Sequence, residues 1–526
     1  MEADWAVREM SGAVLAHGKQ VTSVIRICAE LEAHRELSLT SALGDGLRQA
    51  AHRIFEHEGT SVDGLLAGHY AATAARCRAF PRVLIAQDTC DFVYKQAQIT
   101  GLAQFNQFKA IRGLKGHGAL ALTTAGTPLG LLHLTLRGEA GEAGEAGEVG
   151  EAGEAGEAGD VDAELPRDPN AWVPLAERES YKWHEGLQAV AARLPPETEG
   201  VLIQDREGDI FALLGAERPD HLHLLVRASY NRSITYATLV EAPEVRIAGT
   251  AAGRAGAAPA VAPLPLTSGG PGPEARAVPL LRTERGSLFA VAAAAPRCGE
   301  LQVQVPRRAA TPPHPARAAR KAVLEVRVTE VRLQRPRREA QTPAVPREVT
   351  VWVVHAAEIT AGIPPEDRIC WVLLSTLPVP DLTTAGELVG YYVRRWTIER
   401  LHYTLKSGLR VERLQIDDAR SLGHALALYY VVACRLLELT YLARHDPERP
   451  AVAVLEASEL AVLAAATRLP VATVAQAVAA IAKLGGHTSY RKALPPGVKV
   501  LWQGLQRLHG LAEGWRLAYQ TDPVAR

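Results

Sequence analysis

The segment from Tyr392 to Lys406 constrains this chain most strongly, because it predicts a helix with one chemically distinctive face. At about 100° per residue, four polar side chains share a sector roughly 60° wide: Tyr392, Arg395, Glu399 and Lys406. Trp396, Leu401 and Leu405 lie outside this sector and are predicted to anchor the helix in a core. A carboxylate between cations suits a site for a metal ion and a phosphate, although a solvated face with an Arg395–Glu399 ion pair is the alternative.

Two aspartates far upstream follow short apolar segments. Residues 83–86 predict a buried strand with Asp88 just past its end, and residues 200–203 predict a second strand before Asp205. At strand ends in an open α/β sheet, side chains point into the ligand site. A single aspartate in such a place is more often a turn or cap residue, so the interpretation depends on the whole set.

These motifs together resemble one family of bacterial enzymes. The spacing Tyr-x2-Arg-x3-Glu-x6-Lys, the Gln-Asp-Thr at Asp88 and the Asp-Arg-Glu-x-Asp-Ile from Asp205 are similar to DDE transposases of the insertion-sequence-four family, which includes the transposon-five transposase. Segments at residues 179–183, 484–487 and 496–508 extend the resemblance over nearly the whole chain. The fold that it implies is of the α/β class: a ribonuclease-H-like core, a mixed sheet flanked by helices, with a β-rich insertion and helical N- and C-terminal domains.

The resemblance also assigns roles to residues. It implies a catalytic, metal-binding triad for two Mg²⁺ ions, with Mn²⁺ as a substitute: Asp88, Asp205 and Glu399. Two Mg²⁺ ions about 4 Å apart can assist both the attacking and the leaving oxygen of a phosphodiester. The triad members are 117 and 194 residues apart along the chain, so a fold must bring them together.

Other residues are expected at the DNA. Tyr392, Arg395 and Lys406 would hold phosphates beside the cut, and a segment with Arg227 and Arg232 resembles a DNA-contacting part of the family. The resemblance places a further residue, a tryptophan, beside a flipped base near the cut: Trp371. A core position for this tryptophan is an equal alternative.

The chain of 526 residues is too long for one core and should divide into several parts. A Gly-Glu-Ala repeat with seven Glu and one Asp is predicted to be a disordered linker. The expected parts are a helical DNA-binding domain (1–78), the first part of the core (79–211) with the linker (138–160), the β-rich insertion (212–380), the rest of the core (381–445) and a helical dimerisation domain (446–526).

Charge and cysteine content restrict the partners and the compartment. The formal net charge is zero, so basic surface must be local, as in residues 297–347 with twelve Arg and Lys against four acids. The six cysteines form no C-x-x-C pair, which favours reduced thiols in a cytoplasm and argues against structural zinc. The polar start and the lack of an evident 18-residue apolar run predict neither a signal peptide nor a membrane partner.

The expected function is cut-and-paste DNA transposition. The protein would bind the terminal inverted repeats of its element in double-stranded DNA, pair two ends as a homodimer, cut them and join them to target DNA. It would be cytoplasmic, and nucleoid-associated when bound to DNA. Two alternatives remain: a catalytically inactive, transposase-derived DNA-binding protein such as a repressor, and a nuclease of the same fold.

Overall fold

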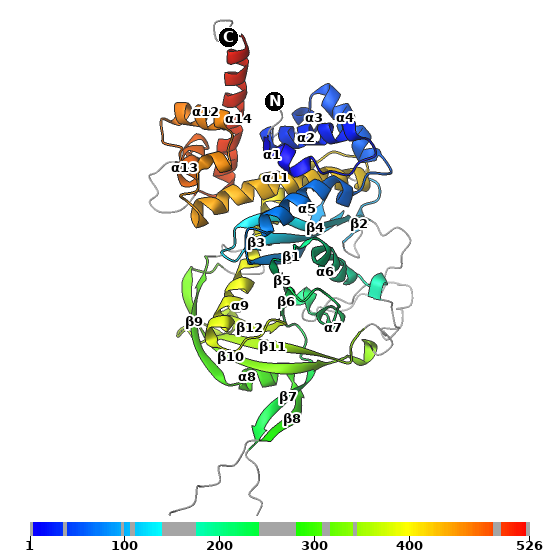
Figure 1. Ribbon diagram of the computed structural model, residues 1–526, viewed down its shortest axis with the longest axis vertical. Helices are drawn as coiled ribbons and strands as arrows, with labels where there is room; N and C mark the ends of the chain where they lie inside the picture. Colours follow the sequence, from blue (N-terminus) through cyan, green and yellow to red (C-terminus); the bar gives the residue numbers. More distant parts are fainter. Residues whose placement is uncertain are drawn as a thin grey trace, which may run out of the picture.

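The described part of the chain forms a twelve-stranded mixed sheet flanked by helices, which is an α/β architecture (Figure 1). This computed structural model describes residues 4–34, 39–95, 99–105, 111–138, 175–240, 280–307, 316–339, 345–487 and 496–521. All but the first residue of the linker predicted at 138–160 lies outside the described residues.

The strands form one continuous path in the order β2-β3-β1-β5-β6-β12-β11-β10-β7-β8, with β4 on β3 and β9 on β10. Their bounds are β1 (Arg82–Val93), β2 (Ala103–Gln104), β3 (Arg112–Thr123), β4 (Pro128–Arg137), β5 (Glu199–Gln204), β6 (Leu222–Arg227), β7 (Ser233–Val240), β8 (Leu280–Ser287), β9 (Arg297–Val305), β10 (Arg320–Gln334), β11 (Glu348–Glu358) and β12 (Cys370–Ser375). Strands are thus present in the region predicted to be β-rich, 212–380. They continue the central sheet, because β6 and β12 pair with each other.

Helices cover both faces of the sheet and gather at one end of the molecule (Figure 1). Their bounds are α1 (Asp4–Met10), α2 (Gly18–Ala33), α3 (Leu39–Ala42), α4 (Asp45–Glu56), α5 (Val62–Cys77), α6 (Tyr181–Arg193), α7 (Phe211–Leu214), α8 (Leu288–Ala294), α9 (Leu382–Arg394), α10 (Trp396–Tyr403), α11 (Ala419–His445), α12 (Ala457–Thr467), α13 (Val474–Leu484) and α14 (Val498–Thr521). Side-chain caps define several starts: Ser61 accepts from the Gly64 N–H at 3.0 Å, and Asp418 accepts from the Ser421 N–H at 2.8 Å.

The strand that carries Asp88 is longer than predicted. Its parallel pairing with β5 ends at Ala86 opposite Ile203, but its antiparallel pairing with β3 continues to Val93 opposite Gly113. Asp88 therefore lies inside β1 and not past its end, because one neighbouring strand stops before it and the other does not. The prediction that the strand ends before Asp88 was therefore wrong.

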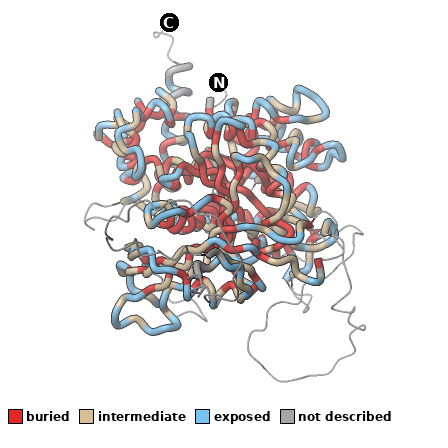
Figure 2. Tube along the Cα trace, turned by 60° about the horizontal axis from the view of Figure 1, so that its bottom comes forward, coloured by how far each residue is buried: buried red, intermediate tan, exposed pale blue. Residues whose placement is uncertain are grey.

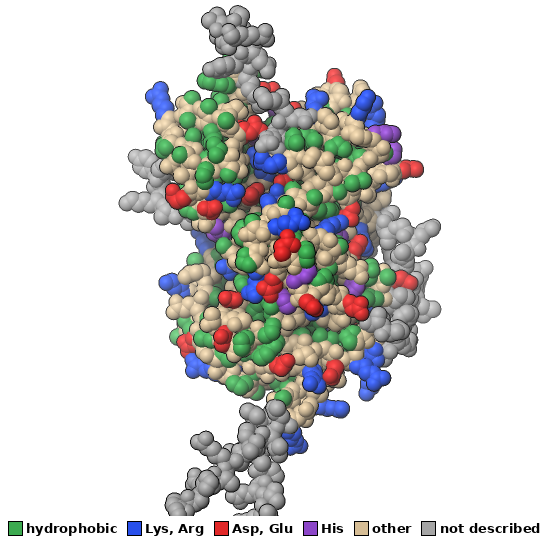
Figure 3. Space-filling view, viewed as in Figure 1, with side chains coloured by type: hydrophobic (Ala, Val, Ile, Leu, Met, Phe, Trp, Pro, Cys, Tyr) green, Lys and Arg blue, Asp and Glu red, His purple; other side chains and the backbone are tan. Residues whose placement is uncertain are grey.

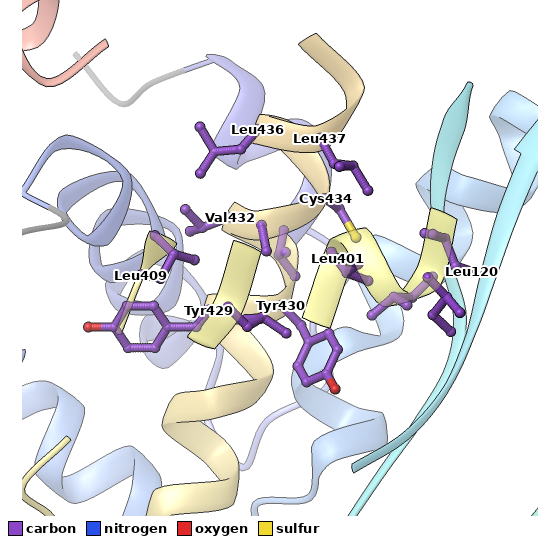
Figure 4. Close-up of a cluster of buried hydrophobic side chains, with 14 of the residues drawn as sticks. Leu120, Leu401, Leu409, Tyr429, Tyr430, Val432, Cys434, Leu436 and Leu437 are labelled. Carbon is purple, nitrogen blue, oxygen red and sulfur yellow. The ribbon is translucent and has the colours of Figure 1, made fainter. Parts of the chain in front are cut away.

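Alternating side chains of β1 and β5 feed two cores on opposite faces of the sheet. Leu84, Ala86 and Ile203 belong to the larger core with α10 and α11, whereas Ile85 and Leu202 belong to the smaller core with α6. Figure 2 shows buried residues concentrated through the centre of the trace. Side chains of the larger core are drawn in Figure 4, including Leu120, Leu401, Tyr430, Val432 and Leu437.

The helix α11 is the central element of the helical end. It is long and apolar enough to cross a membrane by length and composition, but 83% of its most apolar window is buried inside the protein. It packs against α5, β4 and α13. Within the described residues, α11 therefore has the surroundings of a core helix.

The helix predicted from Tyr392 to Lys406 is broken. The helix α9 ends at Arg394, α10 starts at Trp396, and a π-helical turn, η5 (Thr404–Gly408), follows. Asp381 caps α9 by accepting the Thr384 N–H at 2.8 Å.

The anchors predicted for this helix divide into two groups. Leu401 and Leu405 are buried as expected, but Trp396 is 62% exposed, so its predicted anchoring role was wrong. Projection at 100° per residue puts the two leucines at about 180° and 220° and the tryptophan at about 40°, which is the opposite side of the helix.

Candidate active site

Asp88 and Asp205 lie side by side at the edge where two parallel strands stop pairing. Both stand two residues beyond the last pair, Ala86 and Ile203, so the register aligns them on strands about 4.8 Å apart. Side-chain alternation directs both carboxylates to the face of the sheet that α10 covers. Asp205 also caps a short 3₁₀ turn, η2 (Arg206–Gly208), by accepting the Glu207 N–H at 3.0 Å.

The side chain of Arg395 connects Glu399 to this pair of aspartates. Its Nη2 donates to Glu399 Oε1 at 2.5 Å, and its Nη1 lies 3.4 Å from Asp88 Oδ2. The guanidinium is largely buried, with 10% of the side chain exposed. Arg395 stands at the break between α9 and α10, so this break sets its position over β1.

Electrostatics indicate that the three carboxyl groups interact. Burial raises the pKa of Asp88 to about 7; Arg395 opposes the rise, while Asp205 and Glu399 add to it. Burial also raises the pKa of Glu399, which Arg395 lowers and Asp205 raises. Residues far apart in the sequence therefore form one cluster with an excess of negative charge.

In the described ranges, no three His, Cys, Asp or Glu side chains stand close enough together to hold a metal ion. The donor types of the triad nevertheless suit Mg²⁺, which prefers a few carboxylate oxygens and retains water ligands. Burial is the main cause of the raised pKa of Asp88, and Asp205 and Glu399 add to it; a divalent cation would offset the negative charge of these neighbours. Asp88, Asp205 and Glu399 are the residues that would hold such an ion.

Three of the predicted DNA-contacting residues form a second group next to the acids. The rings of Trp371 and Tyr392 meet edge to face, with centroids 5.3 Å apart. Burial raises the pKa of Tyr392, and the charge and hydrogen bond of Arg227 oppose that rise. Asp205 also acts on Tyr392, so the pair of rings and the arginine adjoin the carboxylate cluster.

Two residues of this second group, Arg227 and Trp371, are partly exposed. Arg227 ends β6, Trp371 lies on the neighbouring strand β12, and both side chains are half-buried. Trp371 also packs against the larger core, so the structure is compatible with the equal alternative of a core tryptophan.

Lys406 pairs with Glu412 and not with Asp88, Asp205 or Glu399, although the helical projection predicted that it shares a face with Glu399. Its Nζ is 3.6 Å from Glu412 Oε1 and 5.6 Å from the centre of the Phe92 ring. The π-helical turn changes the rotation per residue before the lysine, so the 100° projection no longer applies. Phe92 and Asp88 share a face of β1, so Lys406 lies further along this same face.

Arg232 has a structural environment in this chain. It is 8% exposed, and its guanidinium donates to Asp209 Oδ1 at 2.7 Å and to the Asp209 carbonyl. The other oxygen of Asp209 accepts the N–H groups of Ser229 and Tyr230. This ion pair folds the loop after β6 and leaves the guanidinium engaged, so a DNA contact by Arg232 is not favoured.

Sequence reasoning missed His402, which lies on α10 beside the acids. Its Nδ1 is 4.0 Å from Asp88 Oδ2, and its Nε2 is buried without a hydrogen-bond partner. Burial, followed by Lys406 and Arg395, lowers its pKa to about 3, so the ring is neutral. The spacing of Arg395, Glu399 and His402 was an available signal, because the histidine projects to about 280°, next to the chosen sector.

The fold and the site define an α/β protein whose mixed sheet carries a half-buried group of carboxylates next to one guanidinium. Comparison of the chain with models of known protein families finds no match. The family assignment therefore stays a prediction from the motifs.

Proposed function

We propose that this protein is a DDE transposase that cleaves DNA at the ends of its element and joins them to target DNA. The observation that carries the proposal is that Arg395 contacts both Asp88 and Glu399, while Asp205 is near enough to raise the pKa of both acids. Three unrelated acids separated by 117 and 194 residues would have no reason to lie in one electrostatic neighbourhood.

The topology supports a ribonuclease-H-like core within the larger sheet. Strands β4, β3 and β1 pair antiparallel in succession, and β1, β5 and β6 pair in parallel. The helix α6 lies between β4 and β5 in the chain, as parallel crossovers require. The catalytic aspartates would then stand on the two central strands of this part.

The chain's own groups would bind and orient the DNA. When bound, Mg²⁺ would activate the attacking oxygen and stabilise the leaving one. Arg395 and Tyr392 would hold phosphate oxygens next to the carboxylates, and Arg227 would extend the cationic surface. Trp371 offers a half-buried aromatic ring on which an unpaired base would stack.

The partners would be double-stranded DNA and a second copy of the chain. Figure 3 shows Lys and Arg side chains interspersed with Asp and Glu on one face, so the DNA-binding surface there would be patchy rather than uniformly basic. On α14, apolar side chains are exposed at positions 511, 515 and 517, which favours the dimerisation role expected for residues 446–526.

The test incubates the purified full-length chain with Mg²⁺ and DNA carrying the sequences that flank its gene. The proposal predicts double-strand cleavage at the element ends followed by joined products. Asp88→Ala, Asp205→Ala and Glu399→Ala should each abolish cleavage and retain DNA binding. Binding without any cleavage would instead support a repressor, and nicking without joined products would support a nuclease.

A further inference from the structure

Two glutamines lie directly behind the catalytic aspartates, on the opposite face of the sheet. Gln87 and Gln204 each precede an aspartate by one residue, and both are fully buried. Gln204 Nε2 donates to Gln87 Oε1 at 2.7 Å. The backbone pairing of β1 and β5 ends one residue earlier, so this amide bridge extends the connection between the strands toward Asp88 and Asp205.

The bridge is tied to the surrounding structure. Gln87 Nε2 donates to His117 Nε2 at 2.8 Å and to the Trp183 carbonyl at 3.2 Å. His117 is buried, which lowers its pKa well below the usual range, so the neutral ring can accept this hydrogen bond. Its other nitrogen lies 2.9 Å from Thr89 Oγ1, and its ring meets Trp183 edge to face at 4.7 Å.

Two glycines leave the space that the amides occupy. A Cβ at Gly186 of α6 would lie 2.1 Å from Gln87 Nε2, and a Cβ at Gly208 would lie 2.6 Å from Gln204 Cβ. Gln204 Oε1 is buried without a hydrogen-bond partner. An apolar side chain would avoid that unsatisfied group, so core packing alone does not explain a glutamine here.

We propose that Gln87 and Gln204 are positioning residues for Asp88 and Asp205. Their amide–amide hydrogen bond fixes β1 against β5 beyond the last backbone pair. It thereby holds the two carboxylates at the separation needed to share a divalent cation. The inference rests on the proposed function and deepens it. Groups behind metal ligands orient those ligands, and their loss typically costs 10- to 100-fold in metal affinity or activity.

The test is Gln204→Met, which keeps the length of the side chain and removes the amide. We expect the Mn²⁺ or Mg²⁺ concentration at half-maximal thermal stabilisation of the full-length chain to rise about tenfold. The metal midpoint for DNA cleavage should rise equally, with the rate at saturating metal within about threefold of wild type. A purely structural role would lower the unfolding temperature without moving either midpoint.

A matched control lies just before the same strand. Thr198 is fully buried, and its hydroxyl donates to the Cys77 carbonyl at 3.3 Å, far from the acids. Thr198→Val also removes one buried hydrogen bond, so it should lower the unfolding temperature and leave both metal midpoints unchanged.

Gly186→Ala is a second, independent variant. Alanine is favoured over glycine inside a helix, but its methyl group would displace the Gln87 amide. It should raise the metal midpoints in the same direction, and it decides the question if Gln204→Met does not fold.

The outcomes separate the inference from the function on which it rests. Metal midpoints equal to those of wild type in Gln204→Met would overturn the inference but not the proposed function. If Gln204→Met does not fold, the same result in Gly186→Ala would do so. A shift of the metal midpoints in Thr198→Val as large as that in Gln204→Met would also overturn the inference. A wild-type chain that neither binds these metals nor cleaves DNA would overturn the proposed function and the inference with it.

Discussion

The carboxylates of Glu9 and Asp88 have equal side-chain exposure, 15% each, but their pKa values are shifted in opposite directions. Burial raises the pKa of Glu9, but His69 and Arg76 outweigh it, and the pKa falls to about 2. At Asp88, burial outweighs the opposing effect of Arg395, Asp205 and Glu399 add to it, and the pKa rises to about 7.

The difference lies in the partners. His69 Nδ1 lies 2.5 Å from one oxygen of Glu9 and Arg76 Nη1 lies 2.5 Å from the other, so this carboxylate is fully matched. Arg395 is shared between Asp88 and Glu399, with Asp205 beside them. In the Glu9 cluster the negative charge is balanced by the groups around it, and the cluster joins α1 to α5 and stabilises the fold. In the Asp88 cluster the acids outnumber the single arginine, so negative charge remains for a ligand.

The largest expected effect is on the rate of DNA cleavage, which should depend on the Asp88 cluster and not on the Glu9 cluster. Asp88→Asn should lower the rate of DNA cleavage by about 10³-fold or more, since the stabilisation by a metal ion is worth several kcal/mol. Glu9→Gln should leave cleavage at the wild-type rate but destabilise the fold by about 3 kcal/mol, because it leaves Arg76 without its charge partner. Gel-based cleavage assays and urea unfolding measure the two effects, and equal loss of activity in both variants would contradict the comparison.

The second expected effect is an opposite dependence of stability on pH. Between pH 3.8 and about 7, folded Asp88 holds a proton that the unfolded chain has released, so its contribution to stability is lost as the pH rises. The ion pairs of Glu9 contribute fully above pH 4.5, and this contribution is lost as the pH falls toward 2.

Unfolding curves without metal can separate these contributions. Asp88→Asn should gain stability relative to wild type as the pH increases from 4 to 7, by a few kcal/mol at most. Below pH 4.5 the disadvantage of Glu9→Gln relative to wild type should shrink, because the interactions of Glu9 in wild type weaken as the pH falls toward 2. A difference between Asp88→Asn and wild type that does not change with pH would contradict the raised pKa of Asp88.

The smallest expected effect concerns the two arginines. Arg395→Met removes the positive charge among the three acids, so added Mg²⁺ should stabilise this variant by about 1 kcal/mol more than it stabilises wild type. Arg76→Met should lose stability that Mg²⁺ does not restore, because its carboxylate lies in the other cluster. Differential scanning fluorimetry with and without Mg²⁺ measures the stabilisation of each variant by the metal. Equal stabilisation of Arg395→Met and Arg76→Met by Mg²⁺ would contradict the difference between the two clusters.

Short-range patterns predicted the three acids. Apolar segments before Asp88 and Asp205 and the spacing around Glu399 are local features, and in the structure Asp205 and Glu399 lie near enough to raise the pKa of Asp88. Where the backbone departs from regular geometry, the same reasoning failed, as at Lys406, which follows a helix break and a π-helical turn.

Partners from distant segments could not be read from the sequence either. Asp209 and Arg232 form a buried pair across a turn, and the bridge between Gln87 and Gln204 depends on a strand register that no local pattern specifies. Asp209 is buried opposite Arg232, so it is a structural acid of this loop.

Iron-directed cleavage of the protein backbone tests the central claim most directly. Fe²⁺ bound in place of Mg²⁺, with ascorbate and peroxide, generates hydroxyl radicals that cut only nearby segments of the chain. The account predicts cuts close to residues 88, 205 and 399 together, which excess Mg²⁺ suppresses and Asp88→Asn removes at all three places. Cuts at one of these segments alone, or at sites elsewhere in the chain, would contradict a shared metal site.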